Sequence, residues 1–249
     1  MKVTALAPVL NEAPWIGYSI MSCINDMHEF IYALDENTND GTRDLLNDIK
    51  THEAHEKLII LETPNFHPHD TQAYNAAFNS CIEKATGDAV YFYHPDMVIL
   101  NPEQLGQIET GPVAWWTSVM SYAGDFQTII TKGRTDRWKN IHARKFGIHY
   151  YGAYGSMNED FYHSEITGKS YKHYGNEFGK YPFEIKPSGL LVNHYCELKN
   201  YARRLEKMKL CLKTQHPTAD QDWINEAAIQ HPRVTLEAGA NKFGDFEFT

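Results

Sequence analysis

Strand-like and helix-like segments alternate over about the first 100 residues, and this alternation constrains the fold more than any other feature. Runs of β-branched and aromatic residues indicate strands, and apolar residues at helical spacing follow three of them. The expected strands cover 3–9, 29–34, 57–62 and a stretch from residue 88, and the expected helices begin at Pro14, Thr42 and Asp70 or Thr71. Because parallel strands need such crossovers, the pattern predicts βαβ units and a largely parallel sheet.

Three of these strands end in acidic or amide side chains, at Asn11 and Glu12, at Asp35 and at Asp96. The carboxyl ends of parallel strands gather along one edge of a sheet, where ligands bind in open α/β folds. We therefore expect a site at this edge, with Asp96 as a metal-binding or phosphate-side group. The alternative is that residues 94–96 form only a turn, since Pro and Asp are common turn residues.

The composition narrows the class of protein. With 249 residues, of which 42% are hydrophobic, the chain is long enough for one large α/β domain. Its formal net charge of −9 makes it no obvious binder of polyanions. It has no run of about 18 apolar residues and no signal-peptide pattern, so we expect no transmembrane helix. Its four cysteines form no CxxC pair, which favours buried free thiols over a zinc site and, without a signal, a cytoplasmic location.

The second half of the chain is less regular. Strands are expected over 114–122, 126–131 and 189–195, and helices over 198–213 and 220–229. Between 134 and 186 the chain is rich in Tyr, His, Gly and Asn, which indicates loops and short strands that form one wall of a cleft. Aromatic surfaces with hydrogen-bonding groups suit sugars or bases. The alternative is that these side chains fill a shallow core under loops.

Four segments resemble motifs of glycosyltransferase family 2, which has the GT-A fold. Pro8-Val9-Leu10-Asn11-Glu12 resembles the family's Pro-x-x-Asn-Glu, and residues 35–42 resemble its Asp-Asp-x-Ser-x-Asp-Gly-Thr. Asn79 precedes residues 85–87 as the family's Asn precedes Ala-x-Gly, and His94-Pro95-Asp96 stands where the family has Asp-x-Asp. The motifs follow the family's order along residues 3–100, with a weaker match at Val192-Asn193-His194-Tyr195.

The resemblance implies an α/β fold of GT-A (Rossmann-like) type, with a central mixed, mostly parallel sheet flanked by helices. It implies a single domain over 1–249, with a nucleotide-sugar-binding half at 1–100 and an acceptor-side half with C-terminal helices at 101–249. The implied donor is a nucleotide sugar, most often a UDP-sugar, and Asp35 would accept a hydrogen bond from the uracil ring N–H. For Asp40 the alternative is that it only caps the following loop. The residues implied to line the nucleotide are Pro8, Val9, Asn11, Glu12, Asp35, Asn37, Asn79 and His94.

The resemblance also implies a divalent ion bound by Asp96, with His94 and His194 as further candidate ligands. Oxygen ligands suit Mg²⁺ or Mn²⁺, and the imidazole of His94 in place of the family's first Asp favours Mn²⁺. The alternatives are that His94 contacts a ribose hydroxyl and that His194 is a buried histidine with satisfied hydrogen bonds. A second departure is Phe78, where the family often has Arg. Three basic residues either lie near the phosphates or form a solvated helix face: Lys199, Arg203 and Arg204.

An inverting transferase needs a general base that takes the proton of the attacking acceptor hydroxyl. The family usually supplies an Asp or Glu, often from a Glu-Asp pair in the second half. Asp160 is the first candidate and Glu159 the second, because they form the only such pair in the Tyr-rich region. Glu184 is the third, since its separation from Asp96 along the chain is closer to the family's. The alternative is that these acids are exposed surface.

The sequence therefore predicts a glycosyltransferase that moves a sugar from a nucleotide-sugar donor to an acceptor hydroxyl, with inversion and with Mn²⁺ or Mg²⁺. The acceptor is a glycan or, as a second option, a modified base in nucleic acid. Basic residues interleaved with Trp138 form either a groove for DNA or a solvated loop: Lys132, Arg134, Arg137, Lys139, Arg144 and Lys145. The departure at His94 motivates another hypothesis, a nucleotide-sugar-binding protein without catalysis. A nucleotidyltransferase is disfavoured because no Gly-rich phosphate loop with Lys is present.

Overall fold

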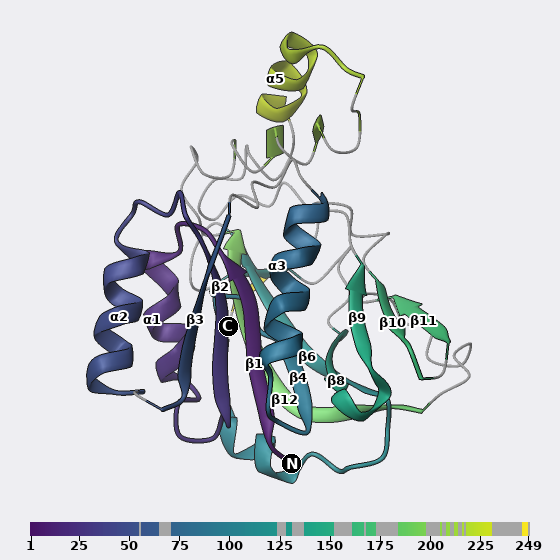
Figure 1. Cartoon of the computed structure of the whole chain (residues 1–249). Helices are drawn as coiled ribbons and strands as arrows, with labels where there is room; N and C mark the ends of the chain where they lie inside the picture. The colour runs from purple at the N-terminus through teal and green to yellow at the C-terminus, as the bar shows by residue number, and fades with distance from the viewer. Residues whose placement is uncertain are drawn as a thin grey trace.

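The N-terminal half of the computed structural model forms the βαβ units that the sequence predicts (Figure 1). The model describes residues 1–54, 56–64, 71–123, 128–130, 137–151, 161–166, 168–172, 184–197, 205, 208–209, 212–213, 216, 218–230 and 246–248. The first elements are β1 (Val3–Val9), α1 (Ala13–Met21), β2 (Glu29–Asp35), α2 (Thr42–His52), β3 (Leu58–Thr63), α3 (Thr71–Lys84) and β4 (Ala89–Phe92). The strands lie in the order β3-β2-β1-β4 and all pair in parallel.

Helices on both sides bury the central strands. Every residue of β2 is buried, and α3 packs against β1 and β2, while α1 and α2 pack against each other on the other side (Figure 1). Ile16 and Ile20 of α1 and Phe78 of α3 have 1% or less of their surface exposed. Burying side chains of this size contributes about 1.5–3 kcal/mol each, which holds the helices on the sheet.

The second half adds antiparallel strands to this sheet. Its elements are β5 (Met97–Ile99), η1 (Pro102–Gln107), β6 (Ala114–Ala123), β7 (Thr128–Ile130), β8 (Arg137–Ala143), η2 (Arg144–Phe146), β9 (Ile148–Tyr151), β10 (Phe161–Ser164), β11 (Lys169–Lys172), β12 (Ile185–Glu197), α5 (Gln221–Gln230) and β13 (Phe246–Phe248). β8 pairs antiparallel with both β4 and β6, whereas β12 pairs in parallel with β6. β9, β10 and β11 form a separate three-stranded sheet. The fold class is therefore α/β, with a mixed sheet flanked by helices.

The observed elements differ from the expected ones mainly in length. The strand from residue 88 stops at Phe92, and residues 97–99 form β5, which pairs antiparallel with β12. The last long strand covers Ile185–Glu197 rather than 189–195, because pairing with both β5 and β6 extends it. The expected helix at 198–213 lies largely outside the described residues.

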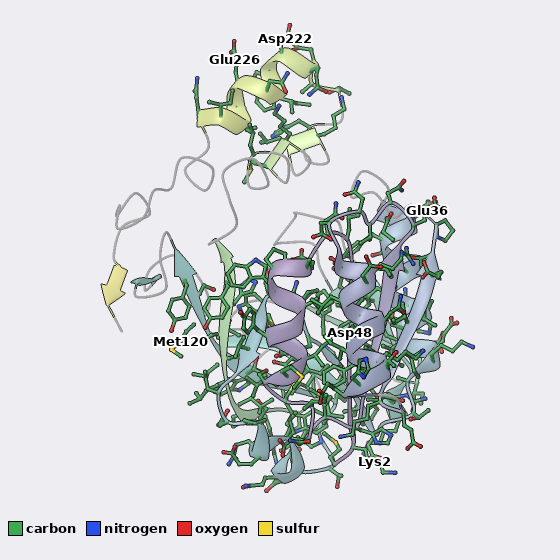
Figure 2. All side chains as sticks on the ribbon, turned by 90° about the vertical axis from the view of Figure 1, so that its left-hand side faces the viewer. Lys2, Glu36, Asp48, Met120, Asp222 and Glu226 are labelled. Atoms are coloured by element: carbon green, nitrogen blue, oxygen red, sulfur yellow. The ribbon has the colours of Figure 1, made fainter. Side chains whose placement is uncertain are left out.

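One edge of the sheet carries the carboxyl ends of the parallel strands. In Figure 2, Glu36, which follows β2, lies at the top of the sheet, and Lys2, which precedes β1, lies at the bottom. Asp222 and Glu226 of α5 lie beyond the edge marked by Glu36. Four of the residues predicted to bind the donor lie on the loops of this edge: Asn11, Glu12, Asn37 and His94. Asp35 is the last residue of β2, Pro8 and Val9 lie in β1, and Asn79 lies within α3.

Candidate active site

The loops after β1 and β2 are joined by hydrogen bonds. The Asn39 backbone N–H donates to Oδ1 of Asn11 over 2.9 Å, and the Glu12 N–H donates to Oγ1 of Thr42 over 2.7 Å. Asn11 has a φ of 55°, a left-handed conformation that Asn tolerates better than most residues. Asn11 is thus placed at the predicted edge, and its side chain holds the two loops together.

Asp40 caps this junction. Its Oδ2 accepts a hydrogen bond from the Ala13 N–H at 3.1 Å, and its Oδ1 accepts from the N–H of Thr42 at 3.0 Å and from the Thr42 hydroxyl. These bonds satisfy backbone donors at the starts of α1 and α2. Asp40 therefore makes the capping contacts that one of its two interpretations expects, and the Asp-Gly-Thr segment holds the loop of Glu12 in place.

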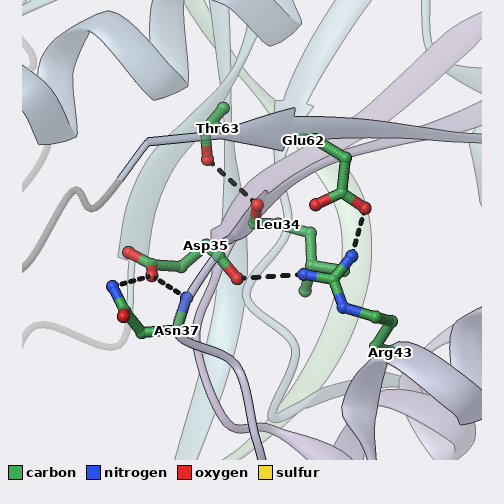
Figure 3. A network of polar contacts seen from close by, with 6 residues as sticks. All are labelled: Leu34, Asp35, Asn37, Arg43, Glu62 and Thr63. Carbon is green, nitrogen blue, oxygen red and sulfur yellow. Dashed lines mark hydrogen bonds and ion pairs between the residues drawn. The ribbon is translucent and has the colours of Figure 1, made fainter.

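Asp35 ends β2 in a fixed orientation (Figure 3). Its Oδ1 accepts hydrogen bonds from the backbone N–H of Asn37 at 2.8 Å and from the Asn37 side-chain amide at 3.1 Å. Asp35 is completely buried, whereas Asn37 is exposed. A buried carboxylate needs such donors, because an unpaired charge is costly to remove from water. A ligand reaches Asp35 only if the groups that cover it move aside.

The end of β2 is tied to α2 and β3 by a network that the sequence did not indicate. Nη2 of Arg43 donates to the Asp35 carbonyl at 3.4 Å, and Nη1 of Arg43 forms an ion pair with Glu62 (Figure 3). The Thr63 hydroxyl donates to the Leu34 carbonyl at 3.1 Å. These contacts lie between residues far apart in sequence, so no local pattern signals them.

Asp96 and His194 meet at the same edge. β12 runs antiparallel to β5, which places His194 opposite Met97, and the Tyr195 N–H donates to the Asp96 carbonyl at 3.0 Å. Nε2 of His194 lies 3.4 Å from Oδ1 of Asp96, and the two residues have 5% and 4% of their surface exposed. The structure therefore brings together two of the three predicted metal-binding residues as a buried pair.

His94 lies in an aromatic cluster beside this pair. Its ring lies 4.4 Å from the ring of Phe92, 5.8 Å from Trp138 and 5.7 Å from His194, between centroids. The rings of Trp138 and His194 are 4.8 Å apart. Trp138 is 5% exposed, so it cannot serve as a surface platform for a base in the predicted DNA groove. It is instead a neighbour of the candidate site, which its sequence context did not indicate.

The described side chains at this edge supply two of the ligands that a divalent ion would need. No group of three His, Cys, Asp or Glu side chains able to hold a metal occurs among the residues that the model describes. The 3.4 Å between Oδ1 of Asp96 and Nε2 of His194 nevertheless suits two ligands of one ion. Ions such as Mg²⁺ are commonly held by one or two protein groups, with water and substrate phosphates completing the shell. Asp96 and His194 fit that arrangement, and His94 does not join them in a three-ligand group.

Asn79 holds β9 against α3. Its side-chain amide donates to the Tyr150 carbonyl at 3.0 Å, and its Oδ1 accepts from the Tyr150 N–H at 2.9 Å. Phe78, which stands where the family often has Arg, packs at 4.4 Å between ring centroids on Phe92 and on Tyr150. Both residues thus have structural contacts that explain them. Of the other predicted nucleotide neighbours, Val9 is buried in the core and Pro8 is partly exposed.

The structure describes only some of the candidate bases and basic residues. Asp160 and Glu159 lie outside the described residues, as do Lys132, Arg134, Lys199, Arg203 and Arg204. Glu184 precedes β12, about 30 Å of extended chain away from His194, and it pairs with Lys186 at 3.2 Å. Arg144 donates to the Gly87 carbonyl at 2.9 Å, and Nζ of Lys145 lies 5.1 Å from the ring centroid of Phe146. The side chains of Arg137 and Lys139 are not described.

Comparisons with known proteins give similarity to solved structures only. No family model and no curated protein matches the chain. A crystal structure of S. aureus TarS 1-349 is similar at a TM-score of 0.43 and 13% identity, over 94% of this chain and 71% of that chain. Because this TM-score is low, the fold class is assigned from the strand order itself. The fold is α/β, with a mixed sheet flanked by helices. No helix in the described part of the chain is long and apolar enough to span a membrane.

Proposed function

We propose that the chain is a glycosyltransferase that moves a sugar from a nucleotide-sugar donor to an acceptor hydroxyl. The observation that carries the proposal is the buried pair of Asp96 and His194, on the sheet edge where the loops of Asn11 and Asp35 also meet. Ligands of open α/β folds bind outside this edge. A carboxylate, an imidazole and two joined polar loops suit a nucleoside diphosphate better than an apolar ligand.

The nucleoside would occupy the β1 and β2 side of the edge. Asp35 would accept a hydrogen bond from a base that carries a ring N–H, as uracil does, and this favours a UDP-sugar. Asn37 would support this role by holding one oxygen of Asp35 in place. Pro8, Asn11 and Glu12 would lie beside the base and ribose. In this proposal Asn79 does not contact the nucleotide, because its side-chain amide is bonded to the backbone of Tyr150.

Asp96 and His194 would hold the divalent ion. Their oxygen and nitrogen donors favour Mn²⁺ over Mg²⁺, since imidazole suits the softer ion. The bound ion would offset negative charge on the diphosphate as the donor bond breaks. Inversion would require a base that takes the proton of the acceptor hydroxyl, and Asp160 or Glu159 remains our proposal for it. Glu184 is not proposed, because it lies at the far end of β12.

Calorimetric titration with UDP, with and without Mn²⁺, tests the donor site. We expect Mn²⁺-dependent binding by the wild type and a loss of at least about 10-fold in Asp96→Asn, which removes a ligand charge without changing side-chain size. Asp26→Asn, on an exposed loop after α1, is the matched control and should bind like the wild type. Absence of UDP binding with either ion would contradict the proposal. Release of UDP from a UDP-sugar then separates an enzyme from a binding protein, which would release none.

A further inference from the structure

Three aromatic side chains from three elements form a stack beside Asp96. The ring of Trp15 in α1 lies nearly parallel to that of Tyr195 in β12, with 5.5 Å between centroids and an angle of 16°. Tyr195 also contacts Tyr122 of β6, at 5.1 Å and 35°. Tyr122 is buried, whereas Trp15 and Tyr195 are partly exposed. The stack therefore has a rigid inner end and reaches the surface with aromatic rings.

The stack is fixed relative to the candidate metal pair. The Tyr195 N–H bonds to the Asp96 carbonyl at 3.0 Å, and His194 precedes Tyr195 in β12. Neighbouring residues of a strand point to opposite faces. The His194 ring accordingly lies with Trp138, and the Tyr195 ring lies with Trp15. The Asp96 carboxylate thus lies beside the His194 imidazole, and the Asp96 carbonyl is bonded to the backbone of Tyr195, whose ring lies on the other face of β12.

Hydrogen-bonding groups accompany the rings. The side-chain amide of Asn193 donates to the Tyr195 hydroxyl at 2.9 Å. Oδ1 of Asn193 is buried and accepts no hydrogen bond from the described residues. A buried acceptor without a donor is unfavourable, and a ligand hydroxyl is one group that would relieve this cost.

We propose that Trp15, Tyr195 and Asn193 bind a pyranose ring of the acceptor, which makes the acceptor a carbohydrate. A pyranose presents an apolar C–H face, which suits the rings, and a rim of hydroxyls, which suits the amide and phenol. The inference rests on the proposed function and names its second substrate. The groups of this platform that the structure describes are uncharged, which favours a neutral sugar over the phosphates of a nucleic acid.

In the proposed transfer, a hydroxyl of the acceptor displaces the diphosphate of the donor. The acceptor oxygen forms a bond to the anomeric carbon while the bond from that carbon to the diphosphate oxygen breaks, and the hydroxyl proton passes to the base. Inversion requires the two oxygens to lie on opposite sides of the carbon.

Ligand-observed saturation-transfer NMR tests this assignment on the whole chain with UDP and Mn²⁺ present. The probes are the methyl glycosides of glucose, galactose and N-acetylglucosamine. We expect at least one to bind through its C–H protons, and Trp15→Ala to raise its Kd about 3- to 10-fold, the range that one aromatic contact supports. Trp15→Phe should restore most of the affinity. Tyr18→Ala is the control, because Tyr18 lies on the same helix and is 73% exposed.

The outcomes separate this inference from the proposed function. If UDP binds but no glycoside does, or if Tyr18→Ala weakens glycoside binding as much as Trp15→Ala, the platform is wrong and the donor site stands. If glycosides bind through Trp15 but UDP does not bind, the donor site is wrong and the platform stands. Binding of a short oligonucleotide through Trp15 in place of the glycosides would overturn the carbohydrate assignment. A Kd for UDP within 2-fold of the wild type shows that Trp15→Ala is correctly folded.

Discussion

At the scale of single residues, hydrogen-bond donors hold a buried carboxylate at each end of the sheet, Glu29 at the amino end and Asp35 at the carboxyl end. At the amino ends, Oε1 of Glu29 accepts bonds from the Thr4 hydroxyl at 2.7 Å, and from the N–H and hydroxyl of Thr86 at 2.6 and 3.0 Å. Burial alone would raise the pKa of Glu29, but these bonds outweigh it, and the pKa lies below its usual value. The charged form of Glu29 therefore stabilises the fold.

Replacement of Glu29 should make stability less dependent on pH. Because the folded pKa is lowered, the stabilisation is fully present above the unfolded pKa of about 4.3 and is lost as the pH falls through the folded value. We expect Glu29→Gln to lower the free energy of unfolding at pH 7 by about 1.5–3 kcal/mol, and by less near pH 3. Urea denaturation at both pH values measures this. Glu83→Gln, on the exposed surface of α3, should change little, and an equal loss at both pH values in Glu29→Gln would contradict the argument.

At the scale of elements, side-chain amides connect segments that backbone hydrogen bonds do not. Asn79 gives both its donor and its acceptor to Tyr150, and so joins α3 to β9. The rings of Phe78 and Tyr74 pack on the Tyr150 ring from the same helix. The three-stranded sheet of β9, β10 and β11 is thereby fixed to the main layer through one helix face.

Loss of the Asn79 amide should affect stability more than binding. Asn79→Ala leaves the N–H and carbonyl of Tyr150 without this partner, so we expect a loss of about 1–3 kcal/mol in the free energy of unfolding. The Kd for UDP should stay within about 2-fold of the wild type, since less than 0.5 kcal/mol is involved. Asn47→Ala, on the exposed face of α2, is the control for both measurements. A stable Asn79→Ala variant that no longer binds UDP would instead assign Asn79 to the nucleotide.

At the scale of the whole molecule, one core joins both helical layers through the sheet. Cys81 lies in α3 and Cys23 directly after α1, so the two free thiols lie on opposite sides of the sheet, and both are buried. Burial raises the pKa of each thiol to about 12. Since the thiolate is the reactive form, neither group should react while the molecule is folded.

Labelling of these thiols should report global unfolding. We expect iodoacetamide at pH 8 to modify Cys23 and Cys81 only across the urea range in which the circular dichroism signal is lost, with both sites following one transition. Peptide mass spectrometry measures each site, and a fully denatured sample gives the reference. Modification of Cys81 at lower urea than Cys23 would show that the α3 layer opens separately, against a single cooperative core.

Local sequence patterns are enough to predict the layered α/β core and the polar loops at the ends of its strands. Alternating strand and helix patterns, with Pro14 and Thr42 at helix starts, are local signals, because propensity and periodicity act within a few residues. The order of Asp35 and Asp96 along the chain sufficed to place both at the carboxyl edge, because parallel connections bring strand ends together. Asn11, Asp35 and Asp96 lie at the strand ends where the sequence predicts them, and their roles toward a donor stay predictions.

The contacts of these side chains, by contrast, depend on the tertiary structure. The sequence allows Trp138 to lie either in a basic groove or in a solvated loop, whereas in the structure it is buried beside His94 and His194, because β8 lies between β4 and β6. Trp15 and Tyr195 are far apart in sequence and meet because β12 returns to the edge next to α1. Pairing of distant strands depends on the burial and register of the whole sheet, which no short sequence window contains. The sequence therefore predicts an acidic residue at the end of this strand, whereas the neighbours of Asp96 follow from the pairing of distant strands.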